Sequence, residues 1–268
     1  MPDPAARELV RQLRRRLYVY LRALLPGSDV AGALQEAEER IARSDAPAEP
    51  LAEWADGVAR QVALERRKTI NPLPFSDDLF RQLADSAAPI LDLSEKRPAV
   101  LAEIFRQLPP PERDLLRRTY DVGLSTAQIA AADGRPAAVV SRELTALRES
   151  LVRAIREALP DAGPEPPGGA ADIGRLSDQL LEGTITDDGR LVLETLLLAD
   201  AAAQAHYYRH AALAADLKWH YLGPPAHSER APALPPQPRL TTREWIVTAA
   251  FVVAVLAVIT FAAVWLAG

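Results

Sequence analysis

Apolar residues recur at helical spacing in successive segments of the chain. Residues 7–25 carry leucines separated by four, four, four and three positions, and this spacing places them on one face of an amphipathic helix. Similar spacing predicts helices over residues 30–44 and 51–68. No segment keeps the alternation of apolar and polar residues that is typical of a strand. We therefore expect an all-α fold.

Residues 108–159 predict three helices separated by two short turns. Ser125 caps the second helix, and a turn that contains Gly134 separates it from the third. A short helix, a glycine-containing turn and a longer helix are typical of a helix-turn-helix, whose second helix enters the major groove of DNA. A plain three-helix hairpin is the alternative. The predicted helices cover residues 112–121, 126–132 and 137–159, and the apolar stripe of the last consists of Val140, Leu144, Leu147, Leu151 and Ile155.

Proline and glycine divide the rest of the chain. Residues 161–171 are rich in both and predict a linker, whereas prolines mark residues 222–240 as a spacer. The segment between this linker and this spacer, residues 172–221, is predicted to be a separate helical module. Its predicted helices cover residues 173–182, 187–198 and 201–220.

Residues 245–266 form an uncharged apolar stretch of 22 residues. As a helix it is roughly 33 Å long, enough to cross the hydrocarbon core of a bilayer. Tryptophans stand near both of its ends, and Arg239 and Arg243 precede it, which favours a cytoplasmic N-terminal side. No signal peptide is apparent near the N-terminus. We expect a single-pass helix in the inner (cytoplasmic) membrane with the preceding domains in the cytoplasm; a buried soluble helix is the alternative.

Charge is distributed unevenly. The chain of 268 residues has a net charge of −5, yet residues 1–160 contain 24 basic and 24 acidic residues. A neutral segment argues against a strong free-standing DNA binder, because phosphate binding depends on cationic surface. The basic run Arg14-Arg15-Arg16 predicts a solvated helix face, as such runs usually do.

The polar residues do not suggest an enzyme. The chain has no cysteine, so thiolate nucleophiles and cysteine-ligated zinc are excluded. His206 and His210 have the i, i+4 spacing of two metal ligands on a helix, but no acidic residue completes a zinc-protease motif around them. No nucleophile–base pair or phosphate-binding loop is apparent. We predict no metal site, no cofactor and no catalytic activity.

The helix-turn-helix segment resembles the fourth region of sigma-70 family factors of the extracytoplasmic-function (ECF) type, which reads the −35 promoter element. The matching positions are Leu108-Pro109, Glu112-Arg113-Asp114-Leu115-Leu116, Tyr120, Gly123-Leu124-Ser125, Gln128-Ile129-Ala130, Gly134-Arg135 and Val140. The resemblance extends over residues 101–160 and implies promoter DNA as a partner.

The third predicted helix of this segment would contact the promoter. Arginine bonds guanine with two hydrogen bonds, and the first turns of a recognition helix face the bases. Glu143 and Glu149 lie among the contacting residues and would repel phosphate, so a solvated face of mixed charge is the alternative. The residues that we predict to contact DNA are Arg135, Ser141, Arg142, Thr145 and Arg148.

Residues 1–68 are similar to the second region of the same family. The resemblance lies in residues 15–41 and in the tryptophan-anchored segment 53–68. It implies that Leu34, Gln35 and Glu36 contact core RNA polymerase. Residues 37–42 lack the aromatic side chains of the family, and opening of the promoter needs such stacking surfaces.

Residues 69–100 contain four prolines and predict a linker with one short helix near residues 77–84. Segment 71–85 looks most like the sigma factors abundant in planctomycetes. A linker here would let the two promoter-reading modules span separated elements.

Residues 172–221 are similar to the cytoplasmic module of FecR-like anti-sigma regulators. The positions that carry this resemblance are Leu181, Gly183, Ile185, Thr186, Leu197, Asp200, Tyr207, Tyr208, His210, Leu217 and Trp219. From the residues alone, the tyrosines and the tryptophan are core residues and His210 is a satisfied polar neighbour.

Together these segments predict a membrane-tethered regulator of transcription initiation that is restrained by its own anti-sigma-like module. The implied partners are core RNA polymerase, promoter DNA, the membrane through residues 245–266, and an anti-sigma or sigma partner protein. The alternative is a degenerate sigma fold that acts as a membrane scaffold or sink without promoter activity.

Overall fold

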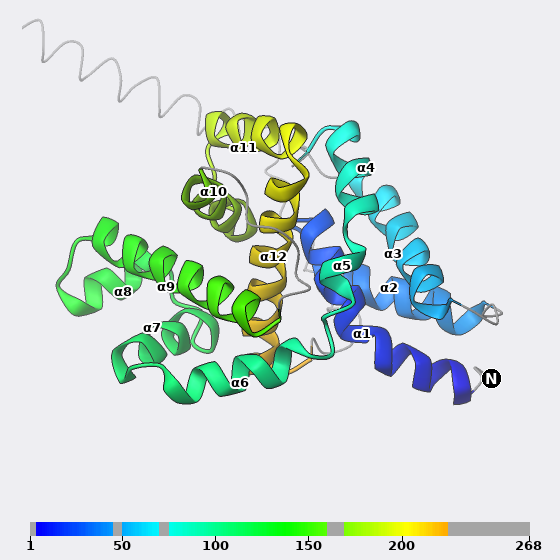
Figure 1. Cartoon of the computed structure of the whole chain (residues 1–268), viewed down its shortest axis with the longest axis horizontal. Helices are drawn as coiled ribbons and strands as arrows, with labels where there is room; N and C mark the ends of the chain where they lie inside the picture. Colours follow the sequence, from blue (N-terminus) through cyan, green and yellow to red (C-terminus); the bar gives the residue numbers. More distant parts are fainter. Residues whose placement is uncertain (1–3, 45–49, 70–74, 160–168, 225–268) are drawn as a thin grey trace, which may run out of the picture. The chain divides into compact units, whose positions relative to one another are not determined.

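A computed structural model describes residues 4–44, 50–69, 75–159 and 169–224, and all regular structure in these segments is helical (Figure 1). The all-α class is therefore confirmed for the described part of the chain. The helices are α1 (Pro4–Leu24), α2 (Val30–Arg43), α3 (Leu51–Arg67), α4 (Asp77–Ser86), α5 (Ala88–Leu91), α6 (Arg97–Gln107), α7 (Pro110–Tyr120), α8 (Thr126–Asp133), α9 (Ala137–Ala158), α10 (Ala170–Glu182), α11 (Asp187–Ala199) and α12 (Ala201–Leu222).

The first three helices agree closely with the predicted ones. Leu17, Leu21 and Leu24 on α1 are fully buried, as their spacing predicts. Asp29 caps α2, because its carboxylate accepts a hydrogen bond of 3.0 Å from the backbone N–H of Gly32. Helices α1, α2 and α3 pack against one another.

The described part of residues 69–100 is not a linker, and this prediction needs correction. Helix α4 confirms the short helix predicted near residues 77–84, but α5 and the start of α6 also lie in this segment, and Phe75, Phe80 and Leu83 are almost completely buried. Pro89 and Pro98 stand in the first turns of α5 and α6, where a missing N–H costs nothing. Pro89 and Pro98 therefore stand at the start of helices and do not interrupt them.

Helix α12 packs against helices from both halves of the described chain. It packs against α1, α4 and α5 on one part of its surface, against α7 and α9 on another, and against α10 and α11 (Figure 1). The hydroxyl of Tyr207 donates to the carbonyl of Ala23 at 2.6 Å, and that of Tyr208 donates to the carbonyl of Leu83 at 2.6 Å. The segment predicted as a separate module, 172–221, thus shares a core with residues 17–93.

The basic run on α1 is not a solvated face, because each of its arginines pairs with a different partner. Arg14 Nε lies 2.9 Å from Glu38 Oε1, and Arg15 Nη2 lies 2.9 Å from Asp216 Oδ1. Arg16 is 6% exposed and binds Asp56 and Asp92. Successive positions on a helix point about 100° apart, so neighbouring arginines can each reach a different helix.

Among the residues that the structure describes, none of the helices combines the length and the apolar character that crossing a bilayer requires. The predicted span over residues 245–266 lies outside those residues.

Candidate functional site

Helices α7, α8 and α9 correspond to the three helices predicted over residues 112–121, 126–132 and 137–159. Ser125 and Gln128 cap α8 reciprocally: the Gln128 N–H donates to Ser125 Oγ at 3.2 Å, and the Ser125 N–H donates to Gln128 Oε1 at 2.9 Å. Gly134 ends α8 with φ at +64°, a left-handed conformation that glycine adopts without strain. Helix α9 then begins at Ala137.

A small apolar cluster fixes α8 against α9. Ile129 and Ala130 of α8 are buried against Val140 of α9. Arg118 of α7 binds Asp133 at 2.9 Å and joins α7 to the end of α8. The geometry of the motif is therefore held by its own side chains.

Three of the residues predicted to contact DNA are exposed near the start of α9. Arg135, Ser141 and Arg142 are exposed, and Thr145 is half-buried. Arg135 binds Glu143, so an acidic side chain occupies the guanidinium that is nearest the turn. DNA binding by these residues remains a prediction.

Arg148 departs from this set because it is buried, with 5% of its surface exposed. It lies four positions after Leu144 and three before Leu151, so it falls within the apolar stripe of α9 itself. The expectation of an exposed Arg148 is thus corrected by the helical periodicity on which the motif rests.

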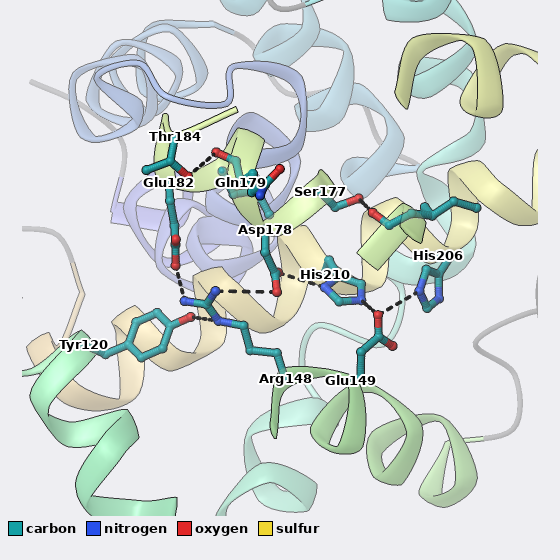
Figure 2. A network of polar contacts seen from close by, with 12 residues as sticks. Tyr120, Arg148, Glu149, Ser177, Asp178, Gln179, Glu182, Thr184, His206 and His210 are labelled. Carbon is teal, nitrogen blue, oxygen red and sulfur yellow. Dashed lines mark hydrogen bonds and ion pairs between the residues drawn. The ribbon is translucent and has the colours of Figure 1, made fainter. Parts of the chain in front are cut away.

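The Arg148 guanidinium is enclosed by polar groups from two other helices (Figure 2). Its Nε donates to the Tyr120 hydroxyl at 2.9 Å, Nη1 lies 3.5 Å from Asp178 Oδ2, and Nη2 binds the Glu182 carboxylate. Burial works against the charged form, but Tyr120, Asp178 and Glu182 outweigh it and raise the pKa of Arg148 above its ordinary value. Burial raises the pKa of the Tyr120 hydroxyl to about 12. An arginine of α9 is therefore held by α10.

The next residue of α9 joins a second buried polar group, which sequence reasoning missed. Glu149 Oε1 lies 3.3 Å from His210 Nε2 and 3.7 Å from His206 Nε2, and both histidines belong to α12 (Figure 2). His210 Nδ1 lies 2.9 Å from Asp178 Oδ1. The sequence shows the spacing of the two histidines. The Glu149 carboxylate comes from α9, far from them in the sequence, and no local motif predicts that it lies beside them.

Burial and charge oppose each other in this group. Burial alone would raise the pKa of the Glu149 carboxyl, but His206 and His210 outweigh it and lower the pKa to about 2. Burial likewise disfavours the charged form of His210, yet Asp178 and Glu149 raise its pKa to about 9. In the absence of metal, His210 is therefore a cation between two carboxylates at neutral pH.

The interaction of His210 with Asp178 and Glu149 makes the free energy of unfolding depend on pH. Because the folded pKa of His210, about 9, exceeds its unfolded value of 6.5, its contribution is fully present below about pH 6.5 and disappears as the pH rises through 9. The shift corresponds to on the order of 3 kcal/mol. Urea unfolding of the chain in EDTA, at intervals from pH 6 to 10, measures the decline. A His210→Gln variant should lose most of this dependence, whereas a His220→Gln variant, at an exposed position of α12, should keep it.

The residues predicted to contact polymerase lie on α2. Leu34 is 1% exposed and belongs to the core, so its side chain supports the helix and does not reach a partner. Gln35 and Glu36 are half-buried at the surface. Glu36 binds Arg40 and Arg66, the latter at 3.1 Å, and Gln35 donates to Glu39 at 3.2 Å. Polymerase contact through Gln35 and Glu36 remains a prediction.

The chain matches no family model, no curated protein and no solved structure.

Proposed function

We propose that this protein is a membrane-tethered, sigma-factor-like regulator of transcription initiation, in which α10–α12 hold the promoter-reading helix α9 in a closed state. The partners in this proposal are core RNA polymerase, promoter DNA and the membrane through residues 245–266. The observation that carries it is the capture of Arg148 by Asp178 and Glu182.

The chemistry of this contact explains how the restraint would work. Carboxylates and phosphates bind a guanidinium in the same way, through charge-assisted hydrogen bonds. Because Arg148 lies on the buried side of α9, its pairing with Asp178 and Glu182 fixes α9 against α10, and the two acidic side chains would also repel an approaching phosphate. Asp178 and Glu182 of α10 thus bind α9, the proposed DNA-reading helix, through Arg148.

The position of α12 supports a second level of restraint. It contacts α1, α4 and α5 of the segment that resembles the second sigma region and its continuation, and α7 and α9 of the segment that resembles the fourth. A sigma factor must place these two regions on separated promoter elements. A helix that packs against both of them opposes that separation.

Reversal of one charge tests the proposal. Glu182→Arg places a cation next to Arg148, and such like-charge contacts cost several kcal/mol. Glu182 is the last residue of α10, where a basic residue suits the helix dipole, so the helix itself should persist. We expect promoter-directed run-off transcription with core polymerase to rise by about tenfold or more, since 1.4 kcal/mol corresponds to a factor of ten.

Asp172→Arg is the matched control. It makes the same charge change on the same helix, at an exposed residue that pairs only with Arg175 among the described residues. Its transcription should equal that of the unaltered chain. The proposal fails if no variant, Glu182→Arg included, supports a promoter-specific transcript with core polymerase.

That negative result would favour the scaffold alternative. One observation points in this direction: Tyr207 and Tyr208 are completely buried in the core shared with α1 and α4, so the anti-sigma-like segment is an integral part of the fold. A permanent closed form would bind partners without reading a promoter. In that case Glu182→Arg should alter stability but not transcription.

A further inference from the structure

We propose that Glu149, His206 and His210 bind a divalent transition-metal ion, for which Zn²⁺ is the best fit. Two imidazoles and one carboxylate are ligands that zinc commonly takes in proteins, with water completing the tetrahedron. The sequence argues against a metal because no acidic residue completes a zinc-protease motif around the histidines. The fold supplies that residue from α9.

The three ligand atoms already converge. One ligand atom from each residue lies within 4.8 Å of the other two, and Glu149 Oε1 faces Nε2 of both histidines (Figure 2). In a tetrahedral zinc site with bonds of about 2.0–2.1 Å, ligand atoms are roughly 3.4 Å apart. The observed separations of 3.3 Å and 3.7 Å from Glu149 Oε1 are close to this value. Small side-chain movements would complete the site.

These atoms are also buried without the hydrogen bonds that buried polar atoms normally make. Glu149 Oε1, His206 Nε2 and His210 Nε2 have no hydrogen-bond partner among the described residues. His206 is 6% exposed and His210 is 1% exposed. Unsatisfied buried polar atoms are costly, and a bound cation satisfies all three at once.

A second carboxylate orients one of the ligands. Asp178 Oδ1 accepts a hydrogen bond from His210 Nδ1 at 2.9 Å, which leaves Nε2 directed toward Glu149. Metal-binding histidines usually donate their other N–H to a carboxylate or carbonyl in this way, and the donation fixes the ring and increases its basicity. Asp178 is thus a positioning residue in this proposal.

The backbone of α10 leaves room for the ligands at one position. A Cβ atom added to Gly174 would overlap Glu149 Oε1 and would lie 2.8 Å from His210 Nε2. Glycine inside a helix is unfavourable by about 1 kcal/mol relative to alanine, so its presence in α10 calls for such a reason. Gly174 permits α10 to approach the polar group closely.

The ion would fasten α9 to α12, because one ligand comes from the former and two come from the latter. Without metal, the protonated His210 ring lies between the carboxylates of Asp178 and Glu149. A metal on Nε2 would displace the proton of that nitrogen to solvent, while Nδ1–H keeps its hydrogen bond to Asp178. This inference is independent of the proposed role in transcription, because it concerns metal binding alone.

Zinc titration of the full chain tests the inference. The protein is purified in mild detergent without a polyhistidine tag and stripped with EDTA. Zn²⁺ is then added in competition with a chromophoric chelator, and the metal content is measured after dialysis. We expect one zinc per chain. Glu149→Gln and His206→Gln should each weaken binding at least 100-fold, and Asp178→Asn should weaken it about 10–100-fold.

His220→Gln is the matched control, since His220 lies on the same helix but is exposed. It should bind zinc as tightly as the unaltered chain. Circular dichroism and thermal unfolding establish which variants fold, and Co²⁺ absorption reports tetrahedral coordination independently of affinity. The inference is overturned if the unaltered chain binds no stoichiometric zinc, or if folded His206→Gln and Glu149→Gln bind it equally well.

Discussion

Replacement of Asp216 by asparagine should lower the free energy of unfolding by about 3–5 kcal/mol. Asp216 is completely buried on α12, and its two oxygens bind two arginines from distant parts of the chain. Oδ1 lies 2.9 Å from Arg15 Nη2, and Oδ2 lies 2.8 Å from Arg97 Nε. Loss of one charge leaves two cations, of which Arg97 is 3% exposed, without their counter-ion.

This cost arises from the cations that remain and not from the net strength of the ion pairs. A buried ion pair contributes little by itself, because desolvation offsets the attraction between its members. Removal of only one member leaves the desolvation uncompensated. Urea unfolding in mild detergent at pH 6 measures the loss, and Asp188→Asn, an exposed change on α11, should shift stability by less than about 0.5 kcal/mol. A loss below 1 kcal/mol for Asp216→Asn would contradict the described ion pairs of Asp216 with Arg15 and Arg97.

Truncation of Tyr207 should have a comparable effect through packing. Its side chain is completely buried, its ring meets Phe75 edge-on with centroids 5.6 Å apart, and its hydroxyl donates to the Ala23 carbonyl. Tyr207→Ala leaves a cavity between α1 and α12, and truncation of a buried aromatic residue costs about 3–5 kcal/mol. Tyr207→Phe removes only the hydrogen bond and should cost about 1 kcal/mol.

The two variants together separate the packing of the ring from its hydrogen bond. Leu222→Ala is the control, because Leu222 lies on the same helix and is 61% exposed. The same unfolding experiment serves all three variants. Equal losses for Tyr207→Ala and Tyr207→Phe would show that the ring does not fill a core shared by α1 and α12.

Helical periodicity predicted most elements, because the fold follows local rules along the chain. The predicted helices over 112–121, 126–132 and 137–159 correspond to α7, α8 and α9, with boundaries that differ by a few residues at most. Ser125 and Gly134 were sufficient signals for the turn, since a capping oxygen and a left-handed glycine act within a few residues.

Prolines misled the prediction for residues 69–100. A proline inside a helix interrupts it, whereas a proline in the first turn is compatible with the start of a helix. Only the position of the neighbouring helix decides which of the two applies. Pro89 and Pro98 take the second role. The aromatic residues Phe75 and Phe80 were the available signal that this segment belongs to the core.

The polar groups of the candidate sites could not be predicted, because their members come from helices far apart in the sequence. The burial of Arg148 follows from its place in the apolar stripe of α9, but its partners Asp178 and Glu182 come from α10. Glu149 looked like a surface carboxylate until α12 supplied two histidines. The partners of Arg148 and Glu149 are brought to them by tertiary packing, and neither the spacing nor the charge of residues along the chain specifies these partners.

The position of α12 also has a kinetic consequence. Most of its residues from Ala203 to Leu217 are buried, and helices from both ends of the described chain surround it. Its backbone amides should therefore exchange with solvent only when the whole unit opens, and hydrogen exchange there should be the slowest in the protein. In the proposed function, spontaneous release of α9 by withdrawal of α12 would then be as slow as global unfolding.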